Sequence, residues 1–417
     1  MLLSNMSSES DDDARKLREK IKDAPDTLTA SGNTYYVSNK GNNSNNGTSP
    51  EKAWQTIEKV NSFAFAAGDV VLFERGGIFR GSLKAHSNVS YGAYGNGDKP
   101  CIYGSRANMS SAVWIEATQN IWVCETQFSN DVGIIVFNHG ENVGIKKLTM
   151  DLSENYEFFH NKADGKIYLY HDNGSPQKYD CIEMGERQHI IQMPTGAENI
   201  IIENLCIKYG GAHGIGGMNF KNVTVRNCEL GWIGGSIQHE NVRYGNAIEN
   251  WEACEDFTVE NCYIYQIYDA GITHQGQEAS TMNNVIFKNN LIEYCTYSIE
   301  YFQRNKNGVM SNITYEGNIM RFAGYGWGHQ RPDKEEAAHI KSWNLPNGAE
   351  NFVIKNNIMD LSRYNLFQII SGNGDRFLPE LDGNRYIQPT SRNIGYWGKE
   401  LFIFDDNTVT TVKNKYR

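Results

Sequence analysis

The stretch Phe257-Thr258-Val259-Glu260-Asn261-Cys262 decides the fold, because the chain repeats its pattern of alternating apolar residues closed by Asn. Similar phrases occupy residues 199–204, 223–228, 285–290, 313–318 and 352–357. The copies follow one another at roughly 23 to 39 residues, with no amphipathic helix between them, which is typical of a parallel β-solenoid. A β-sandwich with ordinary Asn turns is the alternative, but the strand after each Asn also aligns. The sequence therefore predicts an all-β, right-handed parallel β-helix.

The repeated Asn predicts a second feature of the solenoid. The closing position is occupied by Asn204, Asn227, Asn261, Asn289 and Asn356, and once by Gly317. An Asn at one fixed position per coil can hydrogen-bond up and down the stack through its amide. We therefore expect a buried Asn ladder, with Cys228 and Cys262 beside it as small apolar residues.

Composition narrows the function classes. The net charge of −10 argues against a nucleic-acid partner. No stretch is long and apolar enough for a membrane span, and the eight Cys show no zinc-like spacing. Disulfides are possible, but nothing in the sequence demands them.

The N-terminus lacks the pattern of a signal peptide, so we expect either an intracellular protein or a secreted one whose leader is absent, and we favour the secreted form. We also expect a monomer.

The chain divides into five segments. Residues 1–32 are charged and Ser-rich, and we expect a tail or linker with one short helix at Ala14–Lys22. Residues 33–417 form a single β-helix domain, which begins with an N-terminal cap at 33–85. Within this cap, a helix at Ala53–Phe65 should cover the open end of the solenoid. An insertion is expected at about 110–185, followed by regular coils at about 186–371 and a C-terminal cap at 372–417.

Two segments resemble known proteins. The string from Tyr35-Tyr36-Val37-Ser38 through Gly68-Asp69-Val70-Val71-Leu72-Phe73 to Gly76-Gly77 is similar to the N-terminal cap of secreted right-handed parallel β-helix proteins. That superfamily contains pectate and alginate lyases and several glycoside hydrolases. The stretch Glu157–Tyr170 alternates around Ala163-Asp164-Gly165, which is a hairpin signal. This hairpin resembles an insertion of β-helix glycoside hydrolases such as the α-fucosidase/xylanase family, and the resemblance favours hydrolysis over elimination.

Aligning one Ile per coil identifies the side chains that point out of the solenoid. With Ile215, Ile248, Ile272, Ile299 and Ile340 pointing in, the next residues form an outward column. That column consists of Gly216, Glu249, Thr273, Glu300 and Lys341. Coils stack about 4.8 Å apart, so the backbones of Glu249 and Glu300 should lie about 9.6 Å apart. Inverting glycosidases separate their carboxyl groups by about 6.5–9.5 Å.

Further candidates surround this column. We predict Glu249 and Glu300 as the catalytic pair, with Asp269 as the first replacement. The predicted substrate-binding residues are Arg243, Trp251, His274, Tyr301, Arg304, Trp327, Arg331, His339, Lys341 and Trp343. The aromatic residues would pack on the C–H bonds of a sugar ring, and the loop from Trp327 to Asp333 could wall the groove. His213 should face inward as a satisfied core histidine, and His274 and His339 could equally be structural partners.

Three functions remain open at this point. The first is a glycoside hydrolase acting on a plant or microbial polysaccharide or oligosaccharide, without a cofactor or a metal ion. The second is a polysaccharide lyase acting on a uronate polymer. In a lyase, Lys341 would remove the proton, and either Arg243 or a calcium ion held by Glu249, Asp269 and Glu300 would neutralise the carboxylate. The third is a carbohydrate-binding solenoid without catalysis, since one fold hosts all three.

Overall fold

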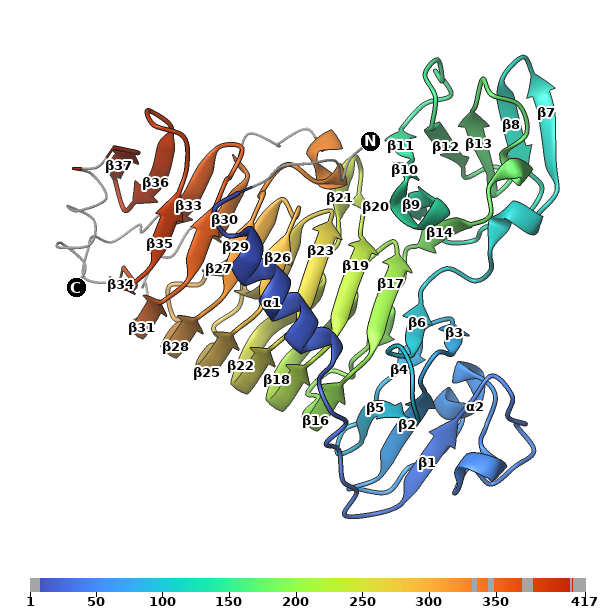
Figure 1. Ribbon diagram of the computed structural model, residues 1–417, viewed down its shortest axis with the longest axis horizontal. Coiled ribbons are helices and arrows are strands. Elements are labelled where there is room, and N and C mark those ends of the chain that lie inside the picture. The colour runs from blue at the N-terminus through green and yellow to red at the C-terminus, as the bar shows by residue number, and fades with distance from the viewer. Residues whose placement is uncertain (1–7, 332–335, 344–348, 370–377, 406, 408–417) are drawn as a thin grey trace.

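The body of the molecule is a right-handed parallel β-helix, as predicted (Figure 1). The computed structural model describes residues 8–331, 336–343, 349–369, 378–405 and 407. Neighbouring coils pair through parallel strands, with partners in direct register from one coil to the next. Among the described residues, no helix is long and apolar enough to cross a membrane.

The coils before the insertion contain the following elements: β1 (Thr34–Val37), η1 (Pro50–Lys52), α2 (Ile57–Asn61), β2 (Val70–Glu74), β3 (Ile78–Arg80), β4 (Leu83–Lys84), β5 (Ser90–Tyr94) and β6 (Cys101–Tyr103). The insertion contains η2 (Met109–Ser111), β7 (Trp114–Thr118), β8 (Ile121–Cys124), β9 (Val132–Phe137), η3 (Asn138–Gly140), β10 (Asn142–Val143), β11 (Ile145–Lys147), β12 (Glu157–Asn161), β13 (Lys166–Tyr170), η4 (Pro176–Lys178) and β14 (Ile182–Glu186).

After the insertion, strands alternate between two long sheets. The larger sheet takes β15 (Ile191–Gln192), β16 (Glu198–Glu203), β18 (Ile215–Arg226), β22 (Ile248–Glu260), β24 (Ala270–Gly276), β25 (Thr281–Lys288), β27 (Tyr297–Gln303), β28 (Val309–Glu316), β30 (Ala338–Ser342), β31 (Glu350–Lys355), β33 (Asn365–Ile369), β34 (Glu380–Asp382), β36 (Asn393–Trp397) and β37 (Glu400–Ile403). The smaller sheet takes β17 (Cys206–Gly210), β19 (Glu229–Ile233), β23 (Tyr263–Ile267), β26 (Leu291–Glu293), β29 (Ile319–Arg321), β32 (Ile358–Asp360) and β35 (Arg385–Ile387). Outside these sheets lie the hairpin β20 (Ser236–His239) and β21 (Val242–Tyr244), and η5 (Trp327–Gln330).

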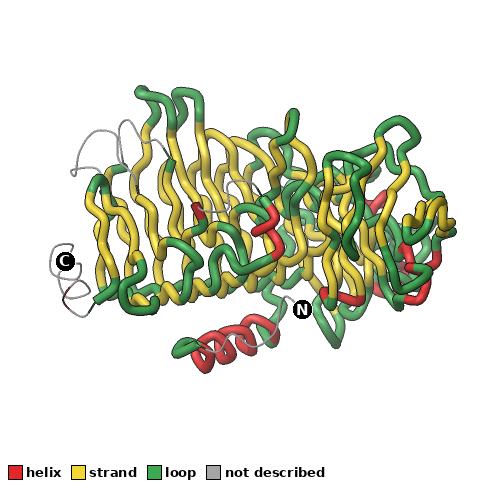
Figure 2. Tube along the Cα trace, turned by 90° about the horizontal axis from the view of Figure 1, so that it is seen from above, coloured by secondary structure: helices red, strands yellow, loops and turns green. Residues whose placement is uncertain are grey.

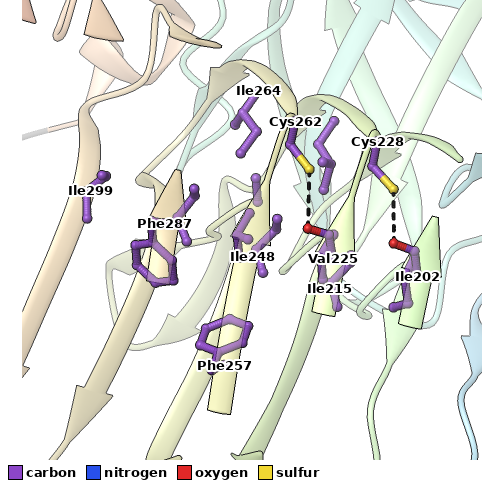
Figure 3. Packing of buried hydrophobic residues seen from close by; sticks show 14 of the residues in the cluster. Ile202, Ile215, Val225, Cys228, Ile248, Phe257, Cys262, Ile264, Phe287 and Ile299 are labelled. Atoms are coloured by element: carbon purple, nitrogen blue, oxygen red, sulfur yellow. Dashed lines mark hydrogen bonds between the residues drawn. The ribbon is translucent and has the colours of Figure 1, made fainter. Parts of the chain in front are cut away.

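The core is a stack of side chains that repeats from coil to coil. Ile215, Ile248, Ile272, Ile299 and Ile340 are register partners in succession, and each is completely buried. Phe257 and Phe287, on neighbouring strands of the same cluster, meet edge to face with ring centres 5.5 Å apart (Figure 3). No single coil could bury these side chains alone, so apolar burial between coils holds the solenoid together.

The buried Asn ladder exists, but one residue later than predicted. It consists of Asn290, Asn318, Asn357 and Asn384. Each of the first three donates a side-chain N–H to the next amide oxygen, at 2.9–3.0 Å. Cys228 and Cys262 occupy this position in the preceding coils, where no amide is present.

The predicted column forms the corner just before the buried ladder. Asn204, Asn227, Asn261, Asn289 and Asn356 have φ between 49° and 56°, and the corresponding Gly317 also has a positive φ, of 64°. Of the five Asn residues, only Asn204 is fully buried. Asn tolerates this left-handed conformation better than other non-Gly residues, so its repetition reflects backbone geometry rather than an amide stack.

The N-terminal segment is not a free tail. Helix α1 (Asp11–Lys22) lies along the outside of the smaller sheet (Figures 1 and 2). Ala14 and Ile21 are buried against Leu291 and Ile319. Arg18 also pairs with the buried Glu293 at 2.7 Å. The sequence prediction missed this docking because the apolar stripe of the helix is short and surrounded by charged residues.

Both ends of the solenoid differ from expectation. The predicted cap helix at 53–65 is reduced to α2, whose Ile57 and Val60 still join the main core. Thr56 caps it by accepting a hydrogen bond from the backbone N–H of Lys59. At the other end, regular stacking continues beyond residue 371, because β34, β35 and β36 pair with β31, β32 and β33. Part of the predicted C-terminal cap is therefore another coil, and residues 372–377, 406 and 408–417 lie outside the described residues.

The insertion forms a small β-structure that projects from the solenoid (Figure 1). Its strands β12 and β13 pair as an antiparallel hairpin around Asp164 and Gly165, as predicted. It has an apolar core of its own that includes Trp114, Phe137, Phe158 and Leu169.

Candidate active site

A cavity of about 510 Å³ opens on the outer face of the larger sheet. Strands β22, β24 and β27 form its floor, and the β20–β21 hairpin contributes Gln238, His239 and Tyr244 to its wall. Three of its lining residues are the predicted catalytic carboxylates Glu249, Asp269 and Glu300. The cavity therefore contains all three predicted catalytic residues.

The register of the strands confirms the order of that column. Gly216 pairs with Glu249, Glu249 with Thr273, Thr273 with Glu300, and Glu300 with Lys341. Glu249 and Glu300 are thus two coils apart, which separates their backbones by about 9.6 Å. Both residues are buried, with 8% and 5% of their surface exposed.

Glu249 is surrounded by hydrogen-bond donors. His213 Nε2 lies 2.8 Å from Glu249 Oε2, and Asn246 Nδ2 donates to the same oxygen at 2.6 Å. The backbone N–H of Asn246 donates to His213 Nδ1 at 3.0 Å, so the proton of a neutral His213 ring is on Nε2, facing the carboxylate. Burial alone would raise the pKa of Glu249, but His213 and Asn246 outweigh it and hold that pKa below its ordinary value. Glu249 is therefore ionised at neutral pH.

Glu300 has the opposite electrostatics. Burial raises its pKa to about 8, and the nearby carboxylates Asp269 and Glu249 act in the same direction. Trp343 Nε1 donates to Glu300 Oε1, and Gln275 Nε2 donates to Oε2. These donors do not offset the burial, so Glu300 carries a proton at neutral pH. One cavity thus holds an ionised and a protonated carboxyl group, which is the division needed for acid–base catalysis.

Asp269 is held by a guanidinium group. Arg331 Nη1 lies 2.5 Å from Asp269 Oδ1, and the same guanidinium lies 5.5 Å from the ring centres of both Tyr268 and Tyr297. Arg331 and Asp269 both line the cavity. The ion pair with Arg331 fixes the position of the Asp269 carboxylate at the edge of the cavity.

Aromatic rings occupy two sides of the cavity. Trp251 and Phe302 meet at 83° with ring centres 6.0 Å apart, and Tyr297 and Trp343 meet at 89° with centres 6.3 Å apart. The exposed Arg304 lies over the Phe302 ring at 4.6 Å. All five residues line the cavity, and their faces suit the apolar sides of sugar rings.

Two predicted substrate-binding cations lie outside the cavity lining. Arg243 is buried, donates to Gly235 O at 2.6 Å and Gln330 Oε1 at 3.0 Å, and fastens the β20–β21 hairpin. Lys341 Nζ lies 3.0 Å from Glu336 and 3.8 Å from the centre of the Trp343 ring. Lys341 therefore lies against the ring that donates to Glu300, rather than in the cavity itself.

Four further candidates are packing residues. His274 and Tyr301 stack in the core, and His274 Nε2 lies 2.7 Å from the hydroxyl of Tyr315. His339 is fully buried between Ser298 Oγ at 3.0 Å and the carbonyl of Asp360 at 3.1 Å. Trp327 packs beside Tyr268 and donates to Gln266 O at 2.8 Å. The loop predicted to wall the cavity contributes Arg331 instead, and Pro332 and Asp333 lie outside the described residues.

His213 was assigned to the wrong face. Strict alternation back from Ile215 points its side chain inward, but the imidazole reaches the cavity and Glu249. His189 stacks on it at 4.9 Å, and burial lowers the pKa of His189 to about 4. Asn246 and Gln275 were also missed as partners of the two carboxyl groups. Asn246 lies three residues before Glu249, and Gln275 lies two residues after Thr273 on the same outward face. These spacings from the outward column could have indicated both contacts.

In the part of the chain that the structure describes, no group of three or more His, Cys, Asp or Glu side chains is arranged to hold a metal ion. The calcium ion of the lyase hypothesis stays an untested expectation.

Comparison with known proteins supports the fold. No family model matches the chain. A stretch of 89 residues, 18% of the chain, is 38% identical to a lacto-N-biosidase of Bifidobacterium longum subsp. longum, and it spans only 6% of that protein. The structure of XylC with xylose matches with a TM-score of 0.51 and 12% identity, covering 89% of this chain and 73% of that one.

Two further solved structures were found at lower similarity. One is described as a glycoside hydrolase, with a TM-score of 0.48, 10% identity and coverage of 92% of this chain and 98% of that one. The other is a rhamnogalacturonan lyase, with a TM-score of 0.44, 12% identity and coverage of 85% and 73%. The structural neighbours are parallel β-helix carbohydrate-active enzymes, and at these identities the likeness concerns the fold.

Proposed function

We propose that this protein is a glycoside hydrolase that cleaves an oligosaccharide or polysaccharide by carboxylate acid–base catalysis. The observation that carries the proposal is the pair Glu249 and Glu300, two coils apart in one aromatic cavity and opposite in protonation. The sequence match to a lacto-N-biosidase and the fold shared with XylC are consistent with it.

In the proposed mechanism, Glu300 is the general acid. Its carboxyl group is protonated at neutral pH because it is buried and has two carboxylate neighbours. It would donate this proton to the glycosidic oxygen as the bond to the leaving sugar breaks. Trp343 and Gln275 hold the carboxyl group in place, and they would stabilise the carboxylate that remains after proton transfer.

Glu249 is the proposed general base. It would take a proton from a water molecule that attacks the anomeric carbon from the opposite side of the ring. His213 and Asn246 keep the carboxylate ionised and orient the oxygen that they share. A two-coil separation leaves room for this water, so the proposal specifies inversion at the anomeric carbon. Asp269, fixed by Arg331, would bind substrate hydroxyl groups.

The pH profile follows from the two carboxyl groups. Activity requires Glu249 deprotonated and Glu300 protonated. It should fall on the alkaline side as Glu300 loses its proton near pH 8, and on the acid side below the ordinary range of a Glu side chain, about 4.3. A profile of kcat/KM without an alkaline limb would contradict the assignment of Glu300 as the acid.

A substrate screen tests the proposal directly. The protein is incubated with nitrophenyl glycosides and with neutral and uronate polysaccharides, and both reducing ends and near-ultraviolet absorbance are followed. New reducing ends without absorbance support hydrolysis. An absorbing, unsaturated product would instead establish a lyase, and binding without turnover would establish a carbohydrate-binding protein. Lys341 is held by Glu336 beneath Trp343, which is an unfavourable position for the base of a lyase.

A further inference from the structure

Two cysteines face each other at the seam where the insertion interrupts the solenoid. Cys101 begins β6, the last strand before the chain leaves the coil, and Cys206 begins β17 in the next coil. They are direct partners in the parallel pairing of these strands. The whole insertion lies between them in the sequence, yet the two residues are neighbours in space.

The backbone geometry at this pair is compatible with a disulfide. Paired positions on adjacent strands lie about 4.8 Å apart, and the Cα atoms of disulfide-linked cysteines usually lie about 4.4–6.8 Å apart. The two thiols also lie close enough to affect each other, because Cys206 lowers the pKa of Cys101 and Cys101 raises the pKa of Cys206. Both cysteines are free thiols in the structure.

The surroundings make Cys101 the accessible and reactive member of the pair. Both thiols line a cavity of about 380 Å³ that also receives Lys208 and, from helix α1, Arg18. Cys101 is partly exposed, whereas Cys206 is buried. The contact with Cys206 lowers the pKa of the Cys101 thiol to about 7, and the positive charge of Lys208 acts in the same direction. A thiol with a pKa of about 7 is about half ionised at neutral pH, and its thiolate is a good nucleophile.

A second cysteine pair provides a natural control. Cys228 and Cys262 are also stacked on adjacent coils and in mutual contact. Both are completely buried in the main core, beside the carbonyl oxygens of Ile202 and Val225 (Figure 3). Neither lines the two cavities described above, and burial should protect both from reagents that reach Cys101.

We propose that Cys101 and Cys206 form a reversible disulfide by exchange with a small-molecule disulfide such as oxidised glutathione. The Cys101 thiolate attacks one sulfur of the reagent, forms a mixed disulfide and releases one glutathione thiolate. The Cys206 thiol then loses its proton to solvent, attacks the Cys101 sulfur and releases the second glutathione. Two protein thiols are oxidised to one disulfide, and one glutathione disulfide is reduced to two thiols.

The bond would fasten the coil before the insertion to the coil after it. It would close residues 101–206 into a loop, and constraining so long a loop in the unfolded chain favours the folded state. The insertion would then be covalently closed at its base. Since the pair lines a different cavity from the carboxylates, this consequence is independent of the proposed hydrolase activity.

The test uses the full-length protein incubated at pH 8 with oxidised or reduced glutathione. After alkylation of the remaining thiols, peptide mass spectrometry should find Cys101 linked to Cys206, and Cys228 and Cys262 alkylated only after unfolding. The melting temperature of the oxidised form should rise by about 3 °C or more. A reductant should reverse the rise, and Cys101→Ser or Cys206→Ser should remove it.

Two results would overturn the proposed disulfide, and a third would overturn its stabilising role. One is that Cys101 and Cys206 remain free thiols after prolonged oxidation. Another is that Cys101 stops at a stable mixed disulfide with glutathione. The third is a Cys101–Cys206 linkage that leaves the melting temperature unchanged, which would exclude the stabilising role. Because the linkage is mapped in the unmodified protein, the test remains decisive even if a Ser variant fails to fold.

Discussion

The outward column Glu249–Thr273–Glu300 and the inward ladder Asn290–Asn318–Asn357–Asn384 have the same origin and opposite consequences. Both arise because each coil places a polar residue above its predecessor. In the ladder, every amide finds an identical partner and a backbone carbonyl, so polarity is fully satisfied inside the core. In the column, burial raises the pKa of Glu300, and the nearby carboxylates Asp269 and Glu249 act in the same direction.

This comparison separates two uses of one repeat. A stack of amides is self-complementary, because each amide is both donor and acceptor, and it stabilises the solenoid. A stack of carboxylates is self-repelling and needs other residues to support it. His213, Asn246, Trp343 and Gln275 supply that support. The candidate site is therefore the place where stacked polar residues cannot hydrogen-bond one another and depend on donors from other positions.

The largest expected effect is on the column. Glu249→Gln and Glu300→Gln should each lower kcat/KM by at least about a hundredfold, because a positioned acid or base is lost. Gln has the shape of Glu, so each variant should melt close to the parent. In Glu300→Gln, the Gln275 amide can rotate to accept a hydrogen bond from the introduced amide. The matched control is Glu255→Gln, an exposed carboxylate on the same strand as Glu249, which should keep full activity. Two fully active Gln variants would place the chemistry elsewhere.

The next effect is on the ladder. Asn318→Leu should reduce the free energy of unfolding by about 1–3 kcal/mol, because Asn290 and Asn357 both lose a partner in a dry core. Chemical denaturation measures this change. Asn261→Gly is the control: this corner residue needs only a positive φ, which Gly adopts freely, so stability should change by less than about 1 kcal/mol. Equal losses in both variants would show that the corner and the ladder are not distinct.

Lys341→Met tests the role of the last residue of the outward column. Lys341 touches Trp343, which donates to Glu300, but does not line the cavity. Loss of its charge should therefore lower kcat/KM by about three- to tenfold through positioning, equivalent to about 0.7–1.4 kcal/mol. Complete loss of activity, with the melting temperature unchanged, would instead favour Lys341 as the base of a lyase.

The sequence predicted the outward column better than it predicted the Asn ladder. The column followed from strand alternation, because residues 248–251 and 299–302 are regular strand, and Glu249, Trp251, Glu300 and Phe302 all line the cavity. Alternation failed at His213 and His339, which are close to where the chain turns into the strand. There, the local bend of the backbone, rather than the alternation of side chains along a strand, decides the direction of a side chain.

The ladder was displaced by one residue for a related reason. The repeated Asn at 261 and 289 was read as an amide stack, whereas its repetition reflects the left-handed corner. The true ladder begins only at Asn290, since Cys228 and Cys262 occupy the equivalent positions in the earlier coils. Too few coils therefore carry Asn at this position for the repeat to stand out in the sequence. The contacts of Glu249 with His213 and of Asp269 with Arg331 join separate coils, and no local pattern encodes them.

The last expected effect concerns the dependence of stability on pH. The folded state raises the pKa of Glu300 to about 8, from an ordinary value of about 4.3 in the unfolded chain. The folded protein therefore holds a proton that the unfolded chain releases. This contribution to stability is fully present below about pH 4, and it declines as pH rises towards 8. Glu300→Gln removes this titration, so the variant should lose less stability than the parent between pH 5 and 9 and should melt higher at pH 9. Melting curves of both proteins across this range measure the difference. Parallel curves would mean that Glu300 is ionised at neutral pH in the folded protein, and the roles proposed for the two carboxyl groups would then have to be exchanged or abandoned.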